Sequence, residues 1–386
     1  MFGALRKIKG DKVIWAVVII LSVFSLLAVY SSTGSLAYRK QGGNTEYYML
    51  KHLIILVFGF GLMYVTHLIK YNYYSRISQV AIVIAGFLLL GTLAMGTNYN
   101  EASRWLTLPV INLTFQSSDF AKLALIMYVA RLITKKQDQI KDFKSAFIPI
   151  LAPIIIICGL IFPANLSTAA MLFITCLVLM FIGRVNLRYI ISMIGIFIVA
   201  MGILVVIIYN SPAQGRLGTW HHRLVSYANG DGGEEEYQVE QAKIAIATGG
   251  IFGKMPGRST QRNFLPHPYS DFIFAIIVEE YGIIGGFVLV LLYLILLFRG
   301  TRIVVKSPGD FGAFLAIGIS FSLVFQAMVN MAVAVHIFPV TGQPLPFVSM
   351  GGTSIWFTSI SIGILLSVSK EIDTENQPKT VEANAA

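Results

Sequence analysis

Charged residues are scarce in this chain. Only 12% of its 386 residues are Asp, Glu, Lys or Arg, whereas 56% are hydrophobic. A soluble globular domain carries roughly twice that charged fraction, because water must solvate most of its surface. The low charge content, together with a mean hydropathy of +0.73, therefore excludes an ordinary soluble protein.

Cysteine is almost absent. Cys158 and Cys176 are the only two cysteines, and both lie in long apolar segments. Disulfides belong to oxidising aqueous compartments, and structural zinc sites need about four ligands close together. The sequence therefore indicates neither a disulfide framework nor a zinc site.

Long apolar runs, by contrast, are plentiful, and each is able to cross a hydrocarbon core of ~30 Å. Every such span must be helical, because lipid offers no partner for a free backbone N–H or C=O group. We predict an all-α polytopic membrane protein of about ten transmembrane helices. The expected helices cover residues 13–31, 52–70, 77–95, 118–134, 146–163, 166–183, 188–209, 271–298, 311–338 and 352–369. Residues 1–386 would form one integral membrane domain, with a large loop at 210–270 and a disordered tail at 370–386.

Lysine and arginine are distributed unevenly between the two sides of this predicted bundle. If the N-terminus is cytoplasmic, most of the 29 basic residues fall in cytoplasmic segments. The short outer loops then hold only Arg39, Lys40, Lys51 and Arg104. Positive charge favours the cytoplasmic side, so both termini are predicted to be cytoplasmic and the 210–270 loop to lie outside. The net charge of +10 would meet anionic lipid headgroups, and no nucleic-acid partner is expected.

The 210–270 loop is far longer than any other predicted connection. Loops of this length in a compact fold carry function or are disordered. Its basic side chains suit a diphosphate, which guanidinium and backbone N–H groups bind well. A solvated outer loop explains the same charge and remains the alternative. The candidate binding residues in this loop are Arg216, Arg223, Lys254, Arg262 and His267.

Ionisable residues also occur at the ends of predicted spans or within them, where they are costly and by default indicate function. Asp119 and Lys122 are three residues apart and share a helix face, so a structural ion pair is the alternative. Asp271 opens the eighth helix, as either a helix N-cap or a catalytic group. Glu279 and Glu280 follow roughly 12 Å deeper, where they should accept hydrogen bonds or pair with a cation.

Residues 338–354 read FPVTGQPLPFVSMGGTS. The prolines and the glycine at position 342 forbid a regular helix. An uncharged, broken segment at membrane depth must pack against protein or line a cavity. Ser349 and Thr353 are its candidate binding residues.

Together these motifs resemble the SEDS family (shape, elongation, division and sporulation) of the FtsW and RodA type, with the FtsW branch favoured. The segments that carry the resemblance are 103–106, 116–122, 263–267, 271–275, 279–282 and 339–354. The chain departs from the family pattern where Asn165 replaces the aspartate of the usual P-D-L-G-T, and where Met350 replaces a common tyrosine.

The resemblance implies a peptidoglycan glycosyltransferase that joins lipid II, a disaccharide-pentapeptide on undecaprenyl diphosphate, into glycan strands during cell division or elongation. Asp271 would be the general base that accepts the proton of the attacking sugar hydroxyl. The implied substrate-binding residues are Arg104, Asp119, Lys122, Arg216, Arg223, Lys254, Arg262, His267, Glu279, Glu280, Ser349 and Thr353. No cofactor and no metal ligands are assigned, and a divalent cation at the diphosphate stays open.

The resemblance also implies a bacterial inner membrane with the active site on the outer face. The implied partners are a class B penicillin-binding protein transpeptidase, other division or elongation proteins, and membrane lipid. A lipid II flippase and a non-catalytic division scaffold remain alternative functions. An O-antigen-ligase-like transferase would perform the same chemistry on another acceptor.

Single cysteines in a chain without Cys158 and Cys176 test the predicted topology. Glu46→Cys, Gly232→Cys and Thr341→Cys should react with an impermeant thiol reagent from outside the cell, because the basic residues place these loops there. Gln139→Cys and Ser307→Cys should remain unlabelled. Labelling at position 139 in intact cells would overturn the orientation.

Overall fold

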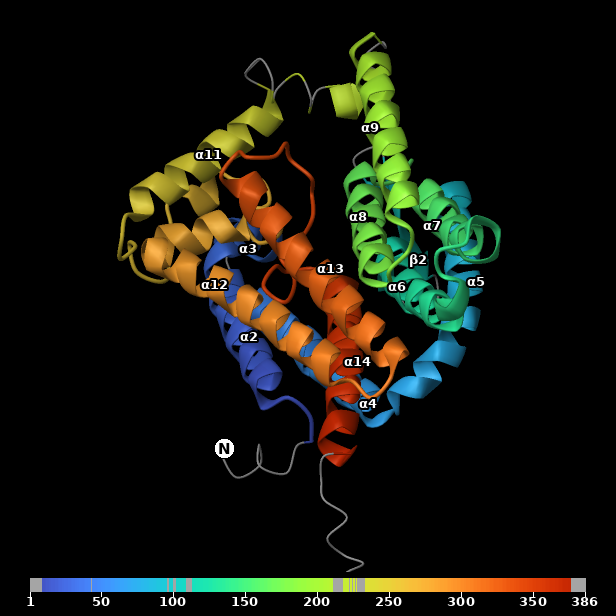
Figure 1. Ribbon diagram of the computed structural model, residues 1–386. Coiled ribbons are helices and arrows are strands. Elements are labelled where there is room, and N and C mark those ends of the chain that lie inside the picture. Colours follow the sequence, from blue (N-terminus) through green and yellow to red (C-terminus); the bar gives the residue numbers. More distant parts are fainter. Residues whose placement is uncertain are drawn as a thin grey trace, which may run out of the picture.

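The computed structural model of the protein describes residues 9–42, 44–95, 97–99, 102–108, 113–210, 218–221, 223, 225, 227 and 233–375. Helices occupy all ten positions at which the sequence predicts them (Figure 1). They are α2 Lys12–Ser32, α4 Thr45–Leu68, α5 Tyr71–Met95, α6 Ser117–Lys135, α7 Ile148–Ile161, α8 Leu166–Ile182, α9 Leu187–Asn210, α12 Ile273–Lys306, α13 Asp310–Ala334 and α14 Thr353–Glu375.

Eight helices of the described chain are long and apolar enough to cross a membrane, so the protein is a multi-pass membrane protein. One of the eight is α7 together with the π-helical turn Phe143–Phe147 that precedes it. Helix α8 is apolar but shorter, and α6, which carries Asp119 and Lys122, is not among the eight. All ten expected spans are thus helices in the structure. Among the described residues, only eight helices are long and apolar enough to count as membrane spans.

The structure differs from the predicted ten-helix arrangement in the connections between helices and at the last helix. A small antiparallel sheet of order β1-β2-β3 lies between α5 and α6, formed by β1 Thr97–Tyr99, β2 Ala102–Leu108 and β3 Leu113–Gln116. Two further helices, α3 Gly34–Gln41 and α11 Glu234–Gly249, stand where loops were expected. Helix α14 continues to Glu375, so the first residues of the expected disordered tail are helical.

Helices α13 and α14 run between two groups of elements (Figure 1). One group contains α2, α3, α11 and α12, and the other contains α5 to α9. Helix α4 packs against α14 at small residues: a Cβ atom at Gly59 would lie 2.7 Å from Ser359 Oγ, and one at Gly363 would lie 1.9 Å from Thr66 Oγ1. Such small residues let membrane helices approach closely, which is where much of their packing energy arises.

A glycine kink interrupts α12 and receives the end of the 210–270 loop. Gly282 has a φ of 71° inside the helix. The kink frees backbone groups that the loop then satisfies: Lys254 N donates to Glu279 O over 2.9 Å, and Ile283 N donates to Gly250 O over 2.9 Å. This close approach needs glycine on both sides, because a Cβ at Gly253 would lie 2.2 Å from Glu280 O.

We therefore expect Gly282→Ala to lower the free energy of unfolding by about 3 kcal/mol or more, through the positive φ and a clash. The added Cβ would lie 2.1 Å from the carbonyl oxygen of Ile251. Thermal unfolding in detergent measures the loss. Gly61→Ala is the matched control, because no atom lies within 4 Å of its Cβ position. Equal melting temperatures for the two variants would contradict this account of the kink.

Candidate functional site

Asp271 lies in the turn that leads into α12, not at its N-cap. The N-cap is Phe272, without a side-chain hydrogen bond, so the capping alternative for Asp271 is wrong. The Asp271 carboxylate accepts a hydrogen bond from Ser270 Oγ at 2.7 Å and remains only half-buried. Its backbone carbonyl accepts from Asn330 Nδ2 at 2.9 Å. The carboxylate is therefore accessible while its backbone is held.

The broken segment between α13 and α14 fastens this turn. Met350 N donates to Tyr269 O over 2.9 Å, and Ser349 Oγ donates to Ser270 O over 2.5 Å. The same Ser349 hydroxyl accepts from Leu345 N at 2.8 Å. Ser349 is 2% exposed, so its structural partners are protein groups rather than solvent. The segment thus packs against protein, as the sequence predicts.

Two amides of α13 hold the broken segment from the other side. Asn330 Nδ2 donates to Gln343 O over 2.7 Å, and Gln326 Nε2 donates to Pro344 O over 2.9 Å. Gln343 Nε2 in turn donates to Thr168 Oγ1 on α8 over 2.8 Å. Gln326 and Asn330 are not among the site residues predicted from the sequence. The sequence does contain a signal for them: two amides lie four residues apart, on one face of a largely apolar helix.

The Asp119–Lys122 pair joins the same frame. Lys122 Nζ lies 2.9 Å from Asp119 Oδ1 and donates to Gln326 Oε1 at 3.0 Å. Both residues line a cavity of about 30 Å³, together with Gln326 and Ser354. A cavity of this size can hold a water molecule. Lys122 and Asp271 are therefore linked through α13 and the broken segment. We call the hydrogen bonds that Gln326 and Asn330 of α13 make with Lys122, the broken segment and Asp271 the polar frame.

A second polar cluster lies where the loop meets the kink of α12. Lys254 Nζ pairs with Glu279 Oε1 at 2.7 Å, and Ser259 Oγ donates to Glu279 Oε2 at 2.5 Å. Glu280 accepts hydrogen bonds from Ser31 Oγ and, at 3.3 Å, from Ser259 N. These five residues, with Arg262, form what we call the glutamate clamp.

The two basic residues of the clamp, Lys254 and Arg262, are bonded to groups of the protein itself. Arg262 Nη1 donates to Ser31 O on α2 over 3.0 Å, and Lys254 Nζ also donates to Thr260 Oγ1 over 3.2 Å. Glu279 and Glu280 are 0% and 1% exposed. Lys254, Arg262 and the two glutamates thus hold residues 254–262 on α12 and α2, and their contact with substrate stays a prediction.

The remaining predicted site residues are dispersed. Arg216 and the side chain of Arg104, which belongs to β2, lie outside the described residues. His267 packs edge-on against Tyr269, with ring centroids 6.1 Å apart, and Thr353 begins α14 as a buried residue. Arg223 borders a small cavity beside α11.

Helix α11 is anchored beside that cavity. Lys243 Nζ lies 2.8 Å from His336 Nδ1, just beyond α13. Burial and the Lys243 ammonium group lower the pKa of His336, so its ring is neutral at neutral pH. The large loop is therefore partly ordered. Among the described residues, no group of three His, Cys, Asp or Glu side chains is arranged to hold a metal ion.

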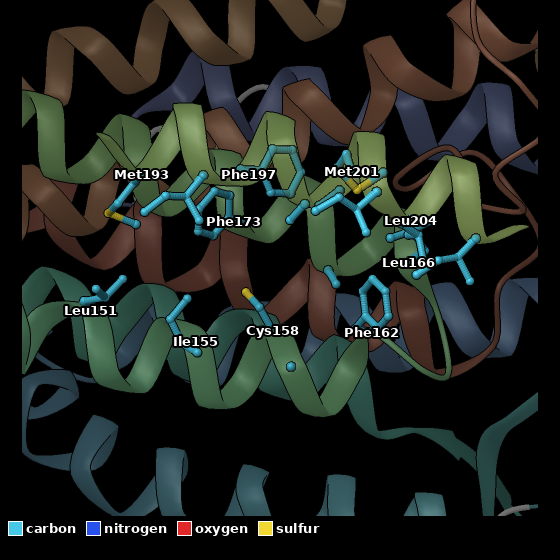
Figure 2. Close-up of a pocket in the computed structure, with 17 residues that line it drawn as sticks. Leu151, Ile155, Cys158, Phe162, Leu166, Phe173, Met193, Phe197, Met201 and Leu204 are labelled. Carbon is cyan, nitrogen blue, oxygen red and sulfur yellow. The ribbon is translucent and has the colours of Figure 1, made fainter. Parts of the chain in front are cut away.

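A large apolar pocket lies away from these polar groups. It has a volume of about 480 Å³ and is lined by apolar side chains of α7, α8 and α9 (Figure 2). Cys158 and Phe162 face Phe173, Phe197 and Met201 across it. Without a hydrogen-bonding side chain, this pocket suits hydrocarbon and not a sugar or a diphosphate.

The fold and the polar frame define a multi-pass membrane protein whose accessible carboxylate is fixed at the end of a bundle helix. Residues 11–374 match the sequence model of the FtsW, RodA and SpoVE family, described as cell cycle proteins. The chain belongs to this family, which confirms the resemblance seen in its motifs.

The relatives cover nearly the whole chain. A probable peptidoglycan glycosyltransferase FtsW of Geobacter sulfurreducens is 32% identical over 368 residues, which are 94% of this chain and 95% of that protein. Stage V sporulation protein E of Bacillus subtilis is 31% identical over 381 residues, covering 95% and 98%.

Solved structures show the same fold. A chain from a study of how a peptidoglycan synthase complex coordinates polymerization and crosslinking aligns with a TM-score of 0.70 at 22% identity, covering 94% of this chain and 98% of that one. The rod shape determining protein RodA of Thermus thermophilus aligns with a TM-score of 0.69 at 20% identity, covering 95% and 98%.

We expect Lys254→Met to release residues 254–262, because it leaves Glu279 buried without its cation. The loss should be about 2 kcal/mol, since Lys254 itself is partly solvated. Limited proteolysis and thermal unfolding measure it. Arg258→Met changes an exposed basic residue of the same segment and serves as control. Adding Glu279→Gln to Lys254→Met should restore part of the loss, and an unaltered protease pattern in the single variant would contradict the clamp.

Proposed function

We propose that this protein is a peptidoglycan glycosyltransferase that polymerises lipid II on the outer face of a bacterial inner membrane, with Asp271 as the general base. Its family membership and the names of its relatives support the activity. The observation that carries the mechanism is the half-buried Asp271 carboxylate on a turn whose carbonyl groups are held by Ser349, Met350 and Asn330.

The reaction needs one base and no covalent enzyme intermediate. The acceptor hydroxyl attacks the anomeric carbon of the donor as Asp271 takes its proton, and the lipid diphosphate leaves from the opposite side with inversion. Proton removal during attack contributes roughly 10²- to 10⁴-fold in rate. A base held by its backbone keeps its geometry with little reorganisation, which favours the near-attack arrangement.

The leaving diphosphate needs cationic and N–H partners. Lys122 is the basic residue that is tied to the polar frame, and we assign it to this role. Arg104, Arg216 and Arg223 are the loop candidates, by their charge and their position in the sequence. The lysine of the clamp is already paired with Glu279, so its contribution is to hold residues 254–262 on α12.

The lipid part of the donor fits the apolar pocket of α7, α8 and α9. Its volume of about 480 Å³ lies within the ~300–1,000 Å³ of typical ligand sites, and its lining is apolar. A bound prenyl segment would gain about 0.8 kcal/mol for each CH₂ removed from water, although less when it leaves lipid. The pocket thus allows a chain segment to be held while the headgroup reacts.

The topology and partners belong to the same proposal. The distribution of basic residues supports cytoplasmic termini and an outer active site. The solved neighbour in a peptidoglycan synthase complex supports a crosslinking transpeptidase as partner, beside other division or elongation proteins. A flippase would need a path for a disaccharide headgroup, whereas the cavity beside Lys122 holds about 30 Å³.

We expect Asp271→Asn to abolish glycan polymerisation while the protein stays folded. The amide oxygen of asparagine can still accept the hydrogen bond of Ser270, but it cannot take the acceptor proton. Purified full-length chain, with and without its transpeptidase partner, is incubated with lipid II, and glycan strands are resolved on gels. Polymer from the wild type alone or in the complex supports the proposal. Near wild-type rates for Asp271→Asn would mean that another residue is the base. If no wild-type preparation forms polymer, the proposed activity is rejected.

The apolar pocket generates a separate expectation. Gly159 lines it, and no atom lies within 4 Å of its Cβ position, so Gly159→Phe fills the pocket without a backbone clash. The variant should use donors with long prenyl chains several-fold less well than wild type, and short-chain donors about equally. Gly202→Phe on α9 is the control, because its Cβ position is equally open but does not line the pocket. Equal losses of activity with long-chain and short-chain donors would show that the pocket does not bind the prenyl chain.

A further inference from the structure

A buried histidine and serine lie behind the broken segment, in a part of the bundle that the mechanism above does not use. Ser25 on α2 and His52 on α4 are both 0% exposed. Ser25 Oγ lies 2.6 Å from His52 Nε2 and donates to the carbonyl oxygen of Val348 over 2.8 Å. Two N-terminal helices thus reach the C-terminal motif through one hydroxyl group.

The hydrogen-bond directions in this chain follow from proton counting. A carbonyl oxygen only accepts, so the single hydroxyl proton of Ser25 must point at Val348 O. The hydroxyl oxygen must then accept from His52 Nε2, which therefore carries a proton. Nδ1 of His52 is buried without a hydrogen-bond partner among the described residues. A neutral ring with its proton on Nε2 satisfies these contacts, because a second proton would add an unpaired N–H and a buried charge.

The contact falls beside the most strained point of the broken segment. Phe347 has a φ of 64°, a left-handed conformation that is costly for a bulky residue. Such strain amounts to about 1–3 kcal/mol and persists only where the surroundings hold it from several sides. Tyr293 Oη donates to Pro346 O over 2.5 Å on one side of Phe347, and Ser25 donates to Val348 O on the other.

From Val348 the connection to the base is short. The next residue, Ser349, donates to the carbonyl of Ser270, and Met350 N donates to the carbonyl of Tyr269. These are the two residues before Asp271. A shift of the Val348 peptide therefore moves the contacts that fix the turn.

We propose that His52 and Ser25 are positioning residues for Asp271: they hold the strained Phe347–Val348 peptide and, through Ser349 and Met350, the turn that carries the base. This inference rests on the proposed glycosyltransferase activity. His52 orients the Ser25 hydroxyl and touches no reacting atom. Loss of either residue should therefore reduce turnover and leave donor binding unchanged.

The test compares kcat and KM for lipid II in the full-length chain with its transpeptidase partner. Ser25→Ala should lower kcat by up to about 100-fold at unchanged KM, because a displaced catalytic group loses rate more than affinity. Ser22→Ala is the matched control: Ser22 lies one turn away on α2, and among the described residues its hydroxyl bonds only to Val18 O of its own helix. It should keep wild-type kcat.

The histidine is tested by the nature of its replacement. His52→Leu should lower kcat as Ser25→Ala does, whereas His52→Gln should retain most of it, because the glutamine amide can donate to Ser25 in place of Nε2. His67→Leu is the control for removing a buried histidine from α4, since His67 packs on Trp15 near the other end of the helix. The Ser25→Ala/His52→Leu double variant should be no slower than Ser25→Ala, because both act through one hydrogen bond.

The outcomes separate this inference from the proposed function. Polymer from the wild type with unaltered kcat in Ser25→Ala rejects the positioning role and leaves the activity standing. A loss carried by KM, equal losses in His52→Gln and His52→Leu, or the same loss in Ser22→Ala would also reject it. If Ser25→Ala does not fold, the comparison of His52→Gln with His52→Leu decides. A wild type without polymer rejects the activity itself.

Discussion

The structure depends on one constraint: at membrane depth, every backbone polar group must find its partner within the protein. A regular helix meets this requirement with its own internal hydrogen bonds. The chain leaves the helical pattern at the kink of Gly282 and in the broken segment before α14, and there other residues supply the partners. The clamp glutamates lie at the first interruption, and the second holds the turn that carries Asp271, the candidate base.

Each interruption is satisfied in a different way. At the kink, the loop backbone donates to the freed carbonyl groups of Glu279 and Glu280, and the glutamate side chains bind the loop in turn. In the broken segment, the partners are side chains from α2 and α13 and backbone carbonyl groups in the turn of Asp271. The first arrangement orders a loop over the bundle, and the second holds a carboxylate.

The polar frame also explains a departure from the family pattern. Asn165 stands where the family has an aspartate, and it is the N-cap of α8, accepting a hydrogen bond from Thr168 N at 3.2 Å. Asparagine and aspartate cap helices about equally well, so the replacement keeps this role. The hydroxyl of the same Thr168 accepts from Gln343. The start of α8 is thereby connected to the broken segment without a carboxylate.

The sequence by itself determined the membrane class and the positions of the ten bundle helices, because a span of apolar residues satisfies its backbone groups only as a helix. It also singled out most of the candidate residues, because an ionisable residue in such a span is costly. From the prolines and glycines of residues 338–354, it predicted that this segment packs against protein or lines a cavity. Only the tertiary structure decided what each candidate contacts. Lys254 and Arg262 have the charge of diphosphate ligands, yet they hold the loop on buried glutamates and on Ser31. Asp271 resembled a helix cap until the helix was seen to begin two residues later. Gln326, Asn330 and the Ser25–His52 pair acquire their meaning from hydrogen bonds between residues up to 323 positions apart, and such distant pairings follow from packing rather than from local pattern.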